Sequence, residues 1–355
     1  MKLEIKNDEN PLSLEGNKER RNRIAREQAK KTLDENIHLN EEEKKSKLED
    51  FDNKGSFTHP ASTLFENNGT VIELKGDTEV KTEKELLDEI DLQHMDFEDQ
   101  EKIRKIFKEN IACLSVSEMD IPICPLVTAK PELNEDAKKK GVQNCKFRDI
   151  PVQIKDQVDK VLAQMVSAGI LKFTNKPTHI VSNLICTAKK DLSPRILLDA
   201  RLINDQCLKI PYQLEPMQSV FQHFHGGKFC SSVDISNSYF SIEIEESMQP
   251  IFSFFNSKKQ MLTFTRCAQG FKNSGAHLQV IASKIKEKNP NVCSFVDDLY
   301  LVTKGDFQDH CEQLRKLLRT LVEFKLKIKG RKAKICTLNL DVLGHNWHID
   351  RFSIP

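Results

Sequence analysis

The sequence predicts an α+β fold in which an antiparallel sheet packs on helices, preceded by a charged N-terminal extension. Residues 293–302 form two short apolar arms that meet at adjacent carboxylates, a pattern typical of a β-hairpin. From about residue 150 onward, segments with apolar residues at helical spacing alternate with strand-like pairs. Residues 1–85 are instead dominated by Lys, Glu, Asp and Asn, so they cannot bury enough apolar surface to order themselves.

Length and composition bound the size of the core. The chain has 355 residues, 38% of them hydrophobic, with 54 Lys+Arg against 53 Asp+Glu. A compact part of one or two domains with a polar extension follows. The formal net charge of +1 neither favours nor excludes a nucleic-acid partner, because such binding depends on local basic surfaces.

Targeting signals and cysteines point to the cell interior. No apolar run approaches the roughly 20 residues that span a bilayer, and Met1–Asp8 lacks the apolar centre of a signal peptide. We therefore expect an intracellular protein, in the cytoplasm or the nucleus, with no membrane partner. The 10 cysteines lie far apart with no C-x-x-C pair, so we expect reduced, mostly buried thiols.

The chain divides into three predicted parts. Residues 1–90 form the charged, largely disordered extension. Residues 91–144 comprise a helix from Asp96 to Ile111, with Asp96 as its N-cap, and then an extended, proline-containing linker. Residues 145–355 form the compact domain.

Within the compact domain, the predicted helices are marked by one apolar face and the strands by β-branched and aromatic residues. The helices cover 151–169, 274–288 and 309–325, and the strands cover 180–188, 195–199, 229–234, 250–255, 260–266 and 332–350.

Adjacent carboxylates at the tip of the 293–302 hairpin suggest a metal site. A tight turn would place Asp297 and Asp298 side by side, and such like charges destabilise a fold unless a cation neutralises them. Asp234 ends a second strand-like run and supplies the further carboxylate that two-metal nucleotidyl transfer requires. Oxygen ligands of this kind suit Mg²⁺ or Mn²⁺. The alternative is a solvated turn, in which Asp is common.

Two other segments have features of phosphate or ligand binding. Lys189 and Arg195 lie at the tip of a predicted hairpin, where they can hold a triphosphate in a cleft or remain solvated on a plain surface. Gln269 and Gly270 form a turn just before a helix start, which allows backbone to approach a ligand closely.

Taken in order, these segments resemble the reverse transcriptases of retroviruses and long-terminal-repeat retrotransposons, especially gypsy-like elements. The likeness covers about residues 90–350. Phe295-Val296-Asp297-Asp298 looks like the family's Tyr-x-Asp-Asp signature, and Val233-Asp234 through Tyr239-Phe240 looks like its first palm motif. Residues 268–274 are similar to the motif whose Gln and Gly contact the incoming nucleotide and template.

The resemblance implies a fingers and palm fold and a role for each matching residue. Asp234, Asp297 and Asp298 would hold two metal ions, and Tyr239 would pack under the sugar to exclude a 2′-hydroxyl. Lys189 and Arg195 match the fingers residues that bind triphosphate, with Asp199 and Arg201 at the family's spacing. Gln269 and Gly270 would complete the nucleotide site.

The sequence departs from the family in several places. Ala268 and Gly275 stand where proline is usual, and Leu192 replaces a glycine. We expect the family's thumb and ribonuclease H segments to be absent. We therefore expect a truncated retroelement pol fragment with weak, distributive synthesis.

The expected function is RNA-directed DNA polymerase activity: transfer of deoxynucleotides to a primer 3′-hydroxyl on an RNA or DNA template, with Mg²⁺ or Mn²⁺. One alternative is a catalytically inactive nucleic-acid-binding relic with the same fold. Another is an interaction protein whose useful part is the charged N-terminal arm.

Overall fold

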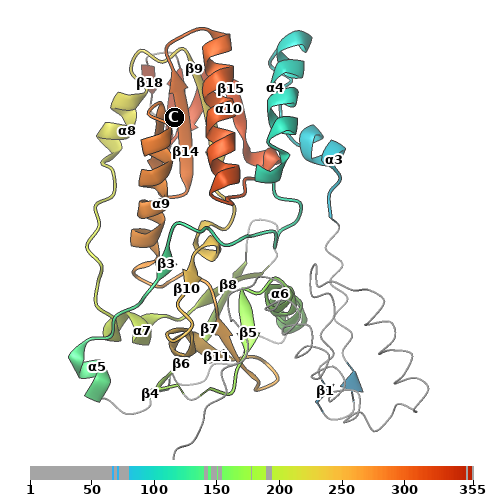
Figure 1. The fold of residues 1–355 in the computed structure, drawn as a ribbon. Helices are drawn as coiled ribbons and strands as arrows, with labels where there is room; N and C mark the ends of the chain where they lie inside the picture. Colours follow the sequence, from blue (N-terminus) through green and yellow to red (C-terminus); the bar gives the residue numbers. More distant parts are fainter. Residues whose placement is uncertain are drawn as a thin grey trace, which may run out of the picture. The chain divides into compact units, whose positions relative to one another are not determined.

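A computed structural model describes residues 66–67, 70–71, 80–139, 143–144, 150, 154–176, 178–188, 194–348 and 351–353 (Figure 1). Residues 61–355 form one compact unit. Helices and antiparallel sheets share a continuous core, which confirms the predicted α+β class. Most of the extension predicted to be disordered lies outside the described residues.

A four-stranded antiparallel sheet, which we call the palm sheet, has the strand order β13-β14-β9-β15. Its strands are β9 (Phe229–Asp234), β13 (Val292–Phe295), β14 (Asp298–Thr303) and β15 (Lys334–Thr337). Alternate residues of a strand face opposite sides of the sheet. Accordingly, Leu299 and Leu301 join the main core, whereas Tyr300 and Val302 join a second apolar cluster.

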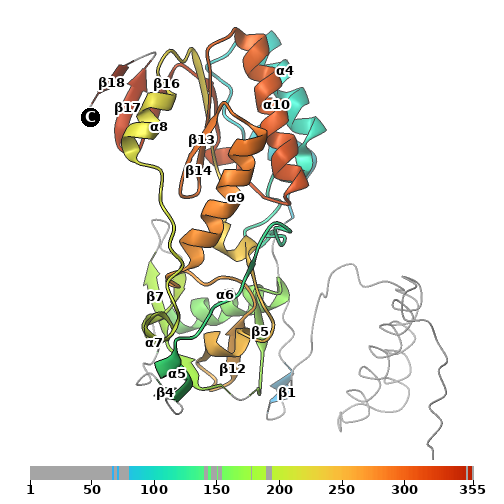
Figure 2. The ribbon, with the colours of Figure 1, turned by 60° about the vertical axis from the view of Figure 1, so that its left-hand side comes forward.

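The palm sheet is covered on both faces. Helices α9 (Ser274–Lys288) and α10 (Phe307–Glu323) pack on the main-core face. On the other face lie α8 (Met217–His223) and a small sheet of β16 (Asn339–Val342), β17 (His345–His348) and β18 (Arg351–Ser353) (Figure 2). Apolar clusters therefore bury both faces of the palm sheet.

The fingers region is built on a second sheet with the order β4-β6-β11-β12-β5. Its strands are β4 (Gln143–Asn144), β5 (Leu171–Phe173), β6 (Ile180–Ser182), β11 (Ser253–Phe255) and β12 (Met261–Phe264). Helix α6 (Lys155–Ser167) ends before Gly169, whose φ of +68° suits the predicted helix terminus. The strand predicted from Pro250 begins later, because Pro250 lies in the 3₁₀ helix η4 (Gln249–Phe252).

A separate hairpin of β7 (Leu184–Ala188) and β8 (Pro194–Leu198) confirms the predicted pairing of these segments. It is followed by the short helix α7 (Arg201–Gln206). Asp199 between them is buried and accepts two hydrogen bonds from Arg201, at 2.7 and 2.6 Å. This bidentate pair fixes the end of β8.

The compact part begins earlier than the predicted boundary near residue 145. Helix α4 (Phe97–Glu109) has the predicted N-cap Asp96 and packs on α10, with Ile103, Ile106 and Phe107 buried. Helix α3 (Glu83–Asp88) lies inside the segment predicted as a disordered extension, yet Leu86 is buried in the main core. The prediction failed here because both helices are mostly charged and bury only a narrow apolar stripe.

The predicted linker is extended but packed. After η1 (Ile111–Cys113), strand β3 (Thr128–Ala129) pairs in parallel with β10 (Glu243–Ile244), and α5 (Glu135–Lys139) follows. The remaining described elements are β1 (Glu66–Asn67), β2 (Thr70–Val71), η3 (Ser238–Ser241) and η5 (Gly330–Lys332). The nine described cysteines are free and all but Cys186 are buried, as predicted. No helix in the described part of the chain is long and apolar enough to cross a membrane.

Candidate active site

Three carboxylates meet at one end of the palm sheet. Asp234 is the last residue of β9, and Asp298 is the first residue of β14 directly opposite it in the antiparallel ladder. Asp297 precedes Asp298 in the hairpin turn, and its carbonyl accepts a hydrogen bond from the Ile235 N–H at 3.1 Å. The fold therefore gathers the predicted aspartates, although Asp234 lies far from the other two along the chain.

The turn that carries Asp297 is strained. Phe295 pairs with Asp298, so Val296 and Asp297 form a two-residue loop, and Val296 has a φ of +57°. A β-branched residue in this region costs about 1–3 kcal/mol and persists only where its surroundings enforce it. Val296 is packed against the main core and Phe295 against the second cluster, so the turn is held from both sides.

The electrostatics of the cluster favour a positive partner. Burial, followed by the charges of Asp297 and Asp234, raises the pKa of Asp298 to about 6. Burial and the charge of Asp234 also raise the pKa of Asp297. These carboxylates are held in the fold against their own repulsion, a condition that a bound cation relieves.

One cation from the chain already lies at the site, and the sequence analysis missed it. Lys332 Nζ is 2.6 Å from Asp234 Oδ2. Lys332 belongs to a run, residues 325–334, in which basic residues alternate with Leu326, Ile328 and Gly330. That alternation was the available signal, because it is typical of an extended segment with one buried face.

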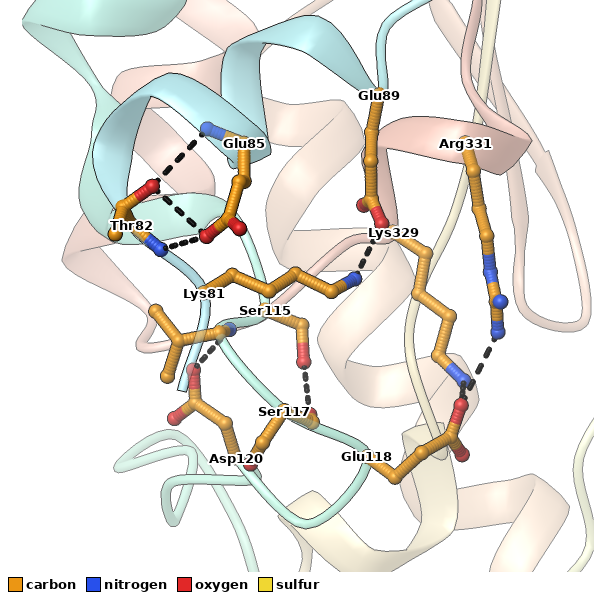
Figure 3. A network of polar contacts seen from close by, with 11 residues as sticks. Lys81, Thr82, Glu85, Glu89, Ser115, Ser117, Glu118, Asp120, Lys329 and Arg331 are labelled. Atoms are coloured by element: carbon orange, nitrogen blue, oxygen red, sulfur yellow. Dashed lines mark hydrogen bonds and ion pairs between the residues drawn. The ribbon is translucent and has the colours of Figure 1, made fainter. Parts of the chain in front are cut away.

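A polar network holds this basic run in place (Figure 3). Glu118 binds Lys329 at 2.8 Å and Arg331 at 3.1 Å. On the other side, a side chain at Gly330 would lie 3.2 Å from the Leu86 carbonyl of α3. The segments before the palm therefore fix the stretch that brings Lys332 to Asp234.

The three carboxylates suit a hard divalent cation such as Mg²⁺ or Mn²⁺ in charge and in ligand chemistry. In the part of the chain that the structure describes, no three His, Cys, Asp or Glu side chains are already close enough to hold an ion. Lys332 takes one of the Asp234 oxygens. We therefore assign the carboxylates as candidate ligands by their chemistry and register.

The Gln269–Gly270 turn is fixed against the fingers. Gly270 has a φ of +103°, and an added Cβ would lie 2.8 Å from the Leu198 carbonyl of β8, so only glycine fits. The Asn204 side chain donates to the Gly270 carbonyl at 2.9 Å and accepts from the Lys272 N–H at 2.8 Å. Gln269 is partly exposed beside this rigid turn.

The other predicted nucleotide-binding residues are placed as follows. Tyr239 lies in η3 shortly after Asp234, and burial, followed by the charges of Asp297 and Tyr212, raises the pKa of its phenol. Arg195 is exposed on β8. Lys189 lies outside the described residues. The structure thus brings Tyr239 close to the carboxylates, whereas the role of Arg195 stays a prediction.

The fold and the site define a class of protein: a fingers and palm fold with three acidic residues at the end of the palm sheet. A family profile described as "Reverse transcriptase (RNA-dependent DNA polymerase)" matches residues 187–347. Residues 187–347 therefore match a reverse transcriptase domain, and the relatives of this part of the chain are Pol polyproteins of retroviruses and retrotransposons.

The curated relatives are long polyproteins. The Pro-Pol polyprotein of Simian foamy virus type 1 is 26% identical over 192 residues, which is 54% of this chain and 16% of the polyprotein. The Pol polyprotein of the Drosophila melanogaster transposon gypsy is 21% identical over 198 residues, or 54% of this chain and 19% of that polyprotein. The chain thus spans less than a fifth of either relative.

Solved structures share the fold. The foamy viral protease-reverse transcriptase in complex with an RNA/DNA hybrid superposes with a TM-score of 0.67 at 19% identity, covering 77% of this chain and 36% of that one. A complex of the same kind of protein with double-stranded DNA gives a TM-score of 0.62, also at 19% identity, with 77% and 46% covered.

Proposed function

We propose that the chain is an RNA-directed DNA polymerase, which joins deoxynucleotides to a primer 3′-hydroxyl on an RNA or DNA template. The observation that carries the proposal is the direct pairing of Asp234 with Asp298 beside Asp297. The foamy viral proteins of the same fold were solved with an RNA/DNA hybrid and with double-stranded DNA, which supports a nucleic-acid partner.

The carboxylates of Asp234, Asp297 and Asp298 are the residues that would hold Mg²⁺ or Mn²⁺. When bound, such ions neutralise phosphate charge and lower the pKa of a coordinated hydroxyl. The chain positions the ligands: the β9–β14 ladder sets Asp234 against Asp298, and the strained turn at Val296 sets Asp297. Lys332 lies where it balances the charge of Asp234.

The remaining predicted residues would shape the nucleotide pocket. Tyr239 would lie against the sugar and exclude a 2′-hydroxyl, while Gln269 and Gly270 would contact the nucleotide and template through a turn that the fingers hold rigid. Lys189 and Arg195 would bind the triphosphate. Base sequence would be read by pairing, so the protein needs to recognise only the shape and backbone of the template.

Primer extension on an RNA template tests the proposal. Purified protein should add deoxynucleotides in the presence of Mg²⁺ or Mn²⁺, and Asp297→Asn and Asp298→Asn should each abolish addition. Incorporation that survives both substitutions would remove the carboxylates from the mechanism.

The same preparation separates the enzyme from the inactive relic. Binding to a primer–template that weakens steeply with salt, without any incorporation, would select the relic. Incorporation that depends on the carboxylates selects the polymerase.

A further inference from the structure

A small cavity beside the carboxylates joins Tyr239 to a second tyrosine. The cavity holds about 60 Å³ and is lined by Tyr212, Tyr239, Gly275 and Val296, among others. These residues come from separate segments: the connection between α7 and α8, η3, the first turn of α9 and the hairpin turn. The predicted sugar-contacting residue Tyr239 and Tyr212 therefore line the same cavity.

Tyr212 approaches α9 closely because residue 275 is glycine. A Cβ added at Gly275 would lie 2.6 Å from the Tyr212 hydroxyl and 3.1 Å from its ring carbon Cζ. The first distance is shorter than real Cβ contacts, so any larger residue would displace the tyrosine. Gly275 is thus the position that lets the Tyr212 side chain reach the cavity.

The segment that carries Tyr212 runs beside α9 (Figures 1 and 2), and side-chain contacts anchor it before and after Tyr212. The buried Asn273 side chain accepts from the Ile210 N–H at 3.0 Å and donates to the Leu208 carbonyl at 2.8 Å. Beyond Tyr212, Lys286 binds Glu215 at 2.8 Å. These anchors define the position of Tyr212, although the residue is exposed, at 39%.

We propose that Tyr212, seated in the space that Gly275 leaves open, is a positioning residue for Tyr239 and thereby sharpens the choice between deoxyribonucleotides and ribonucleotides. The inference rests on the proposed function. Its reason is steric: a half-buried Tyr239 keeps its place only while the neighbouring space is filled, and loss of the Tyr212 ring would let it retreat from the sugar. The contribution of the Tyr212 charge to the raised pKa of Tyr239 agrees with their proximity.

Fluorine NMR tests the positioning directly. The chain has 3 tyrosines, Tyr212, Tyr239 and Tyr300, so 3-fluorotyrosine labelling gives three resonances that single Tyr→Phe variants assign. Gly275→Ala should move the resonances of Tyr212 and Tyr239 and leave that of Tyr300 in place. The matched control is Leu208→Ala, an exposed apolar residue of the same segment, which should move none. A Tyr239 resonance that stays fixed in Gly275→Ala would overturn the proposal.

Nucleotide selectivity tests the consequence. We expect Tyr212→Ala to lower the ratio of kcat/KM for a deoxynucleotide to kcat/KM for the matching ribonucleotide by about tenfold, the scale of a small misfit in a pocket. Tyr212→Phe should keep the ratio, because the ring fills the space. Gly275→Ala should lower the ratio. Adding Tyr212→Phe to Gly275→Ala should restore it in part, because removal of the hydroxyl leaves the ring carbon Cζ, at 3.1 Å, as the nearest contact of the new Cβ.

The two measurements separate the two proposals. If the parent protein incorporates no nucleotide, the proposed function fails and the fluorine spectra alone decide whether Tyr212 positions Tyr239. If incorporation depends on the carboxylates but the ratio is unchanged in Tyr212→Ala, the role of Tyr212 in selectivity is wrong while the polymerase stands.

Discussion

Asp298→Asn should stabilise the cation-free protein while it abolishes nucleotide transfer. The pKa of Asp298 rises from 3.8 to about 6 in the fold, and each pKa unit corresponds to about 1.4 kcal/mol. Keeping this carboxylate ionised at neutral pH therefore costs about 3 kcal/mol in the absence of a cation. Asparagine has nearly the same shape and no charge, so it removes most of that cost.

The gain is readily measured by thermal unfolding in a chelating buffer. Because Asp298 is partly exposed, we expect the substitution to raise the free energy of unfolding by about 2 kcal/mol, which corresponds to a rise in Tm of roughly 4–8 °C. Adding Mg²⁺ should raise the Tm of the parent protein more than that of the variant, since the ion binds the folded carboxylates. The matched control is Asp341→Asn, an exposed carboxylate of β16, which should shift stability by less than about 0.5 kcal/mol.

Two results would refute the reasoning. If Asp298→Asn is no more stable than the parent without Mg²⁺, the carboxylates are not under mutual strain. If Mg²⁺ raises both Tm values equally, the ion binds elsewhere.

Three further predictions concern the scaffold. Burial lowers the pKa of His310 to about 4. The unfolded chain therefore takes up a proton before the folded protein does, and the free energy of unfolding should fall by about 3 kcal/mol between pH 6.5 and pH 4. An unfolding free-energy gap between parent and His310→Gln that does not shrink on acidification would contradict this. Gly270→Ala should cost about 3 kcal/mol, because φ and the close β8 carbonyl both exclude a side chain, whereas Gly169→Ala, with open space around it, should cost about 1 kcal/mol. Equal losses in chemical denaturation would count against the close contact. A chain starting at residue 93 should unfold more easily, by at least about 4 kcal/mol, than one starting at residue 61, because buried apolar side chains of α3 and the following loop are lost. Equal denaturation midpoints would show that these residues do not support the core.

The site carboxylates were predictable because local patterns specify them. The arms around Asp297 and Asp298 are apolar and rich in β-branched and aromatic residues, which defines a hairpin, and Asp234 ends a run with strand character. The pairing of β9 with β14 then follows from the burial of both sheet faces, which fixes the register.

Other features depend on contacts that a sequence does not display. The position of Lys332 depends on Glu118 and α3, which hold its segment from elsewhere in the chain. Val296 would be expected in an extended conformation, and only the packed turn gives it a positive φ. Tyr212 and Gly275 are 63 positions apart in the sequence, and only the folded chain brings them into contact.

The helices α3 and α4 were assigned outside the compact domain for a different reason. Their surfaces are dominated by charge, and each contributes only a few buried apolar residues. Composition averages over both faces of a helix, whereas packing depends on one face. The helix over residues 96–111 was predicted and only its packing on the core was missed, whereas α3 was missed altogether.

Single-nucleotide addition by Asp234→Asn on an RNA template tests the central claim most directly, since this residue joins the cluster only through the folded sheet. We predict that addition falls by at least about a hundredfold relative to the parent protein, the scale expected when a group that stabilises transition-state charge is removed. Primer–template binding should remain intact. Addition within a few-fold of the parent rate would show that the three carboxylates do not act together.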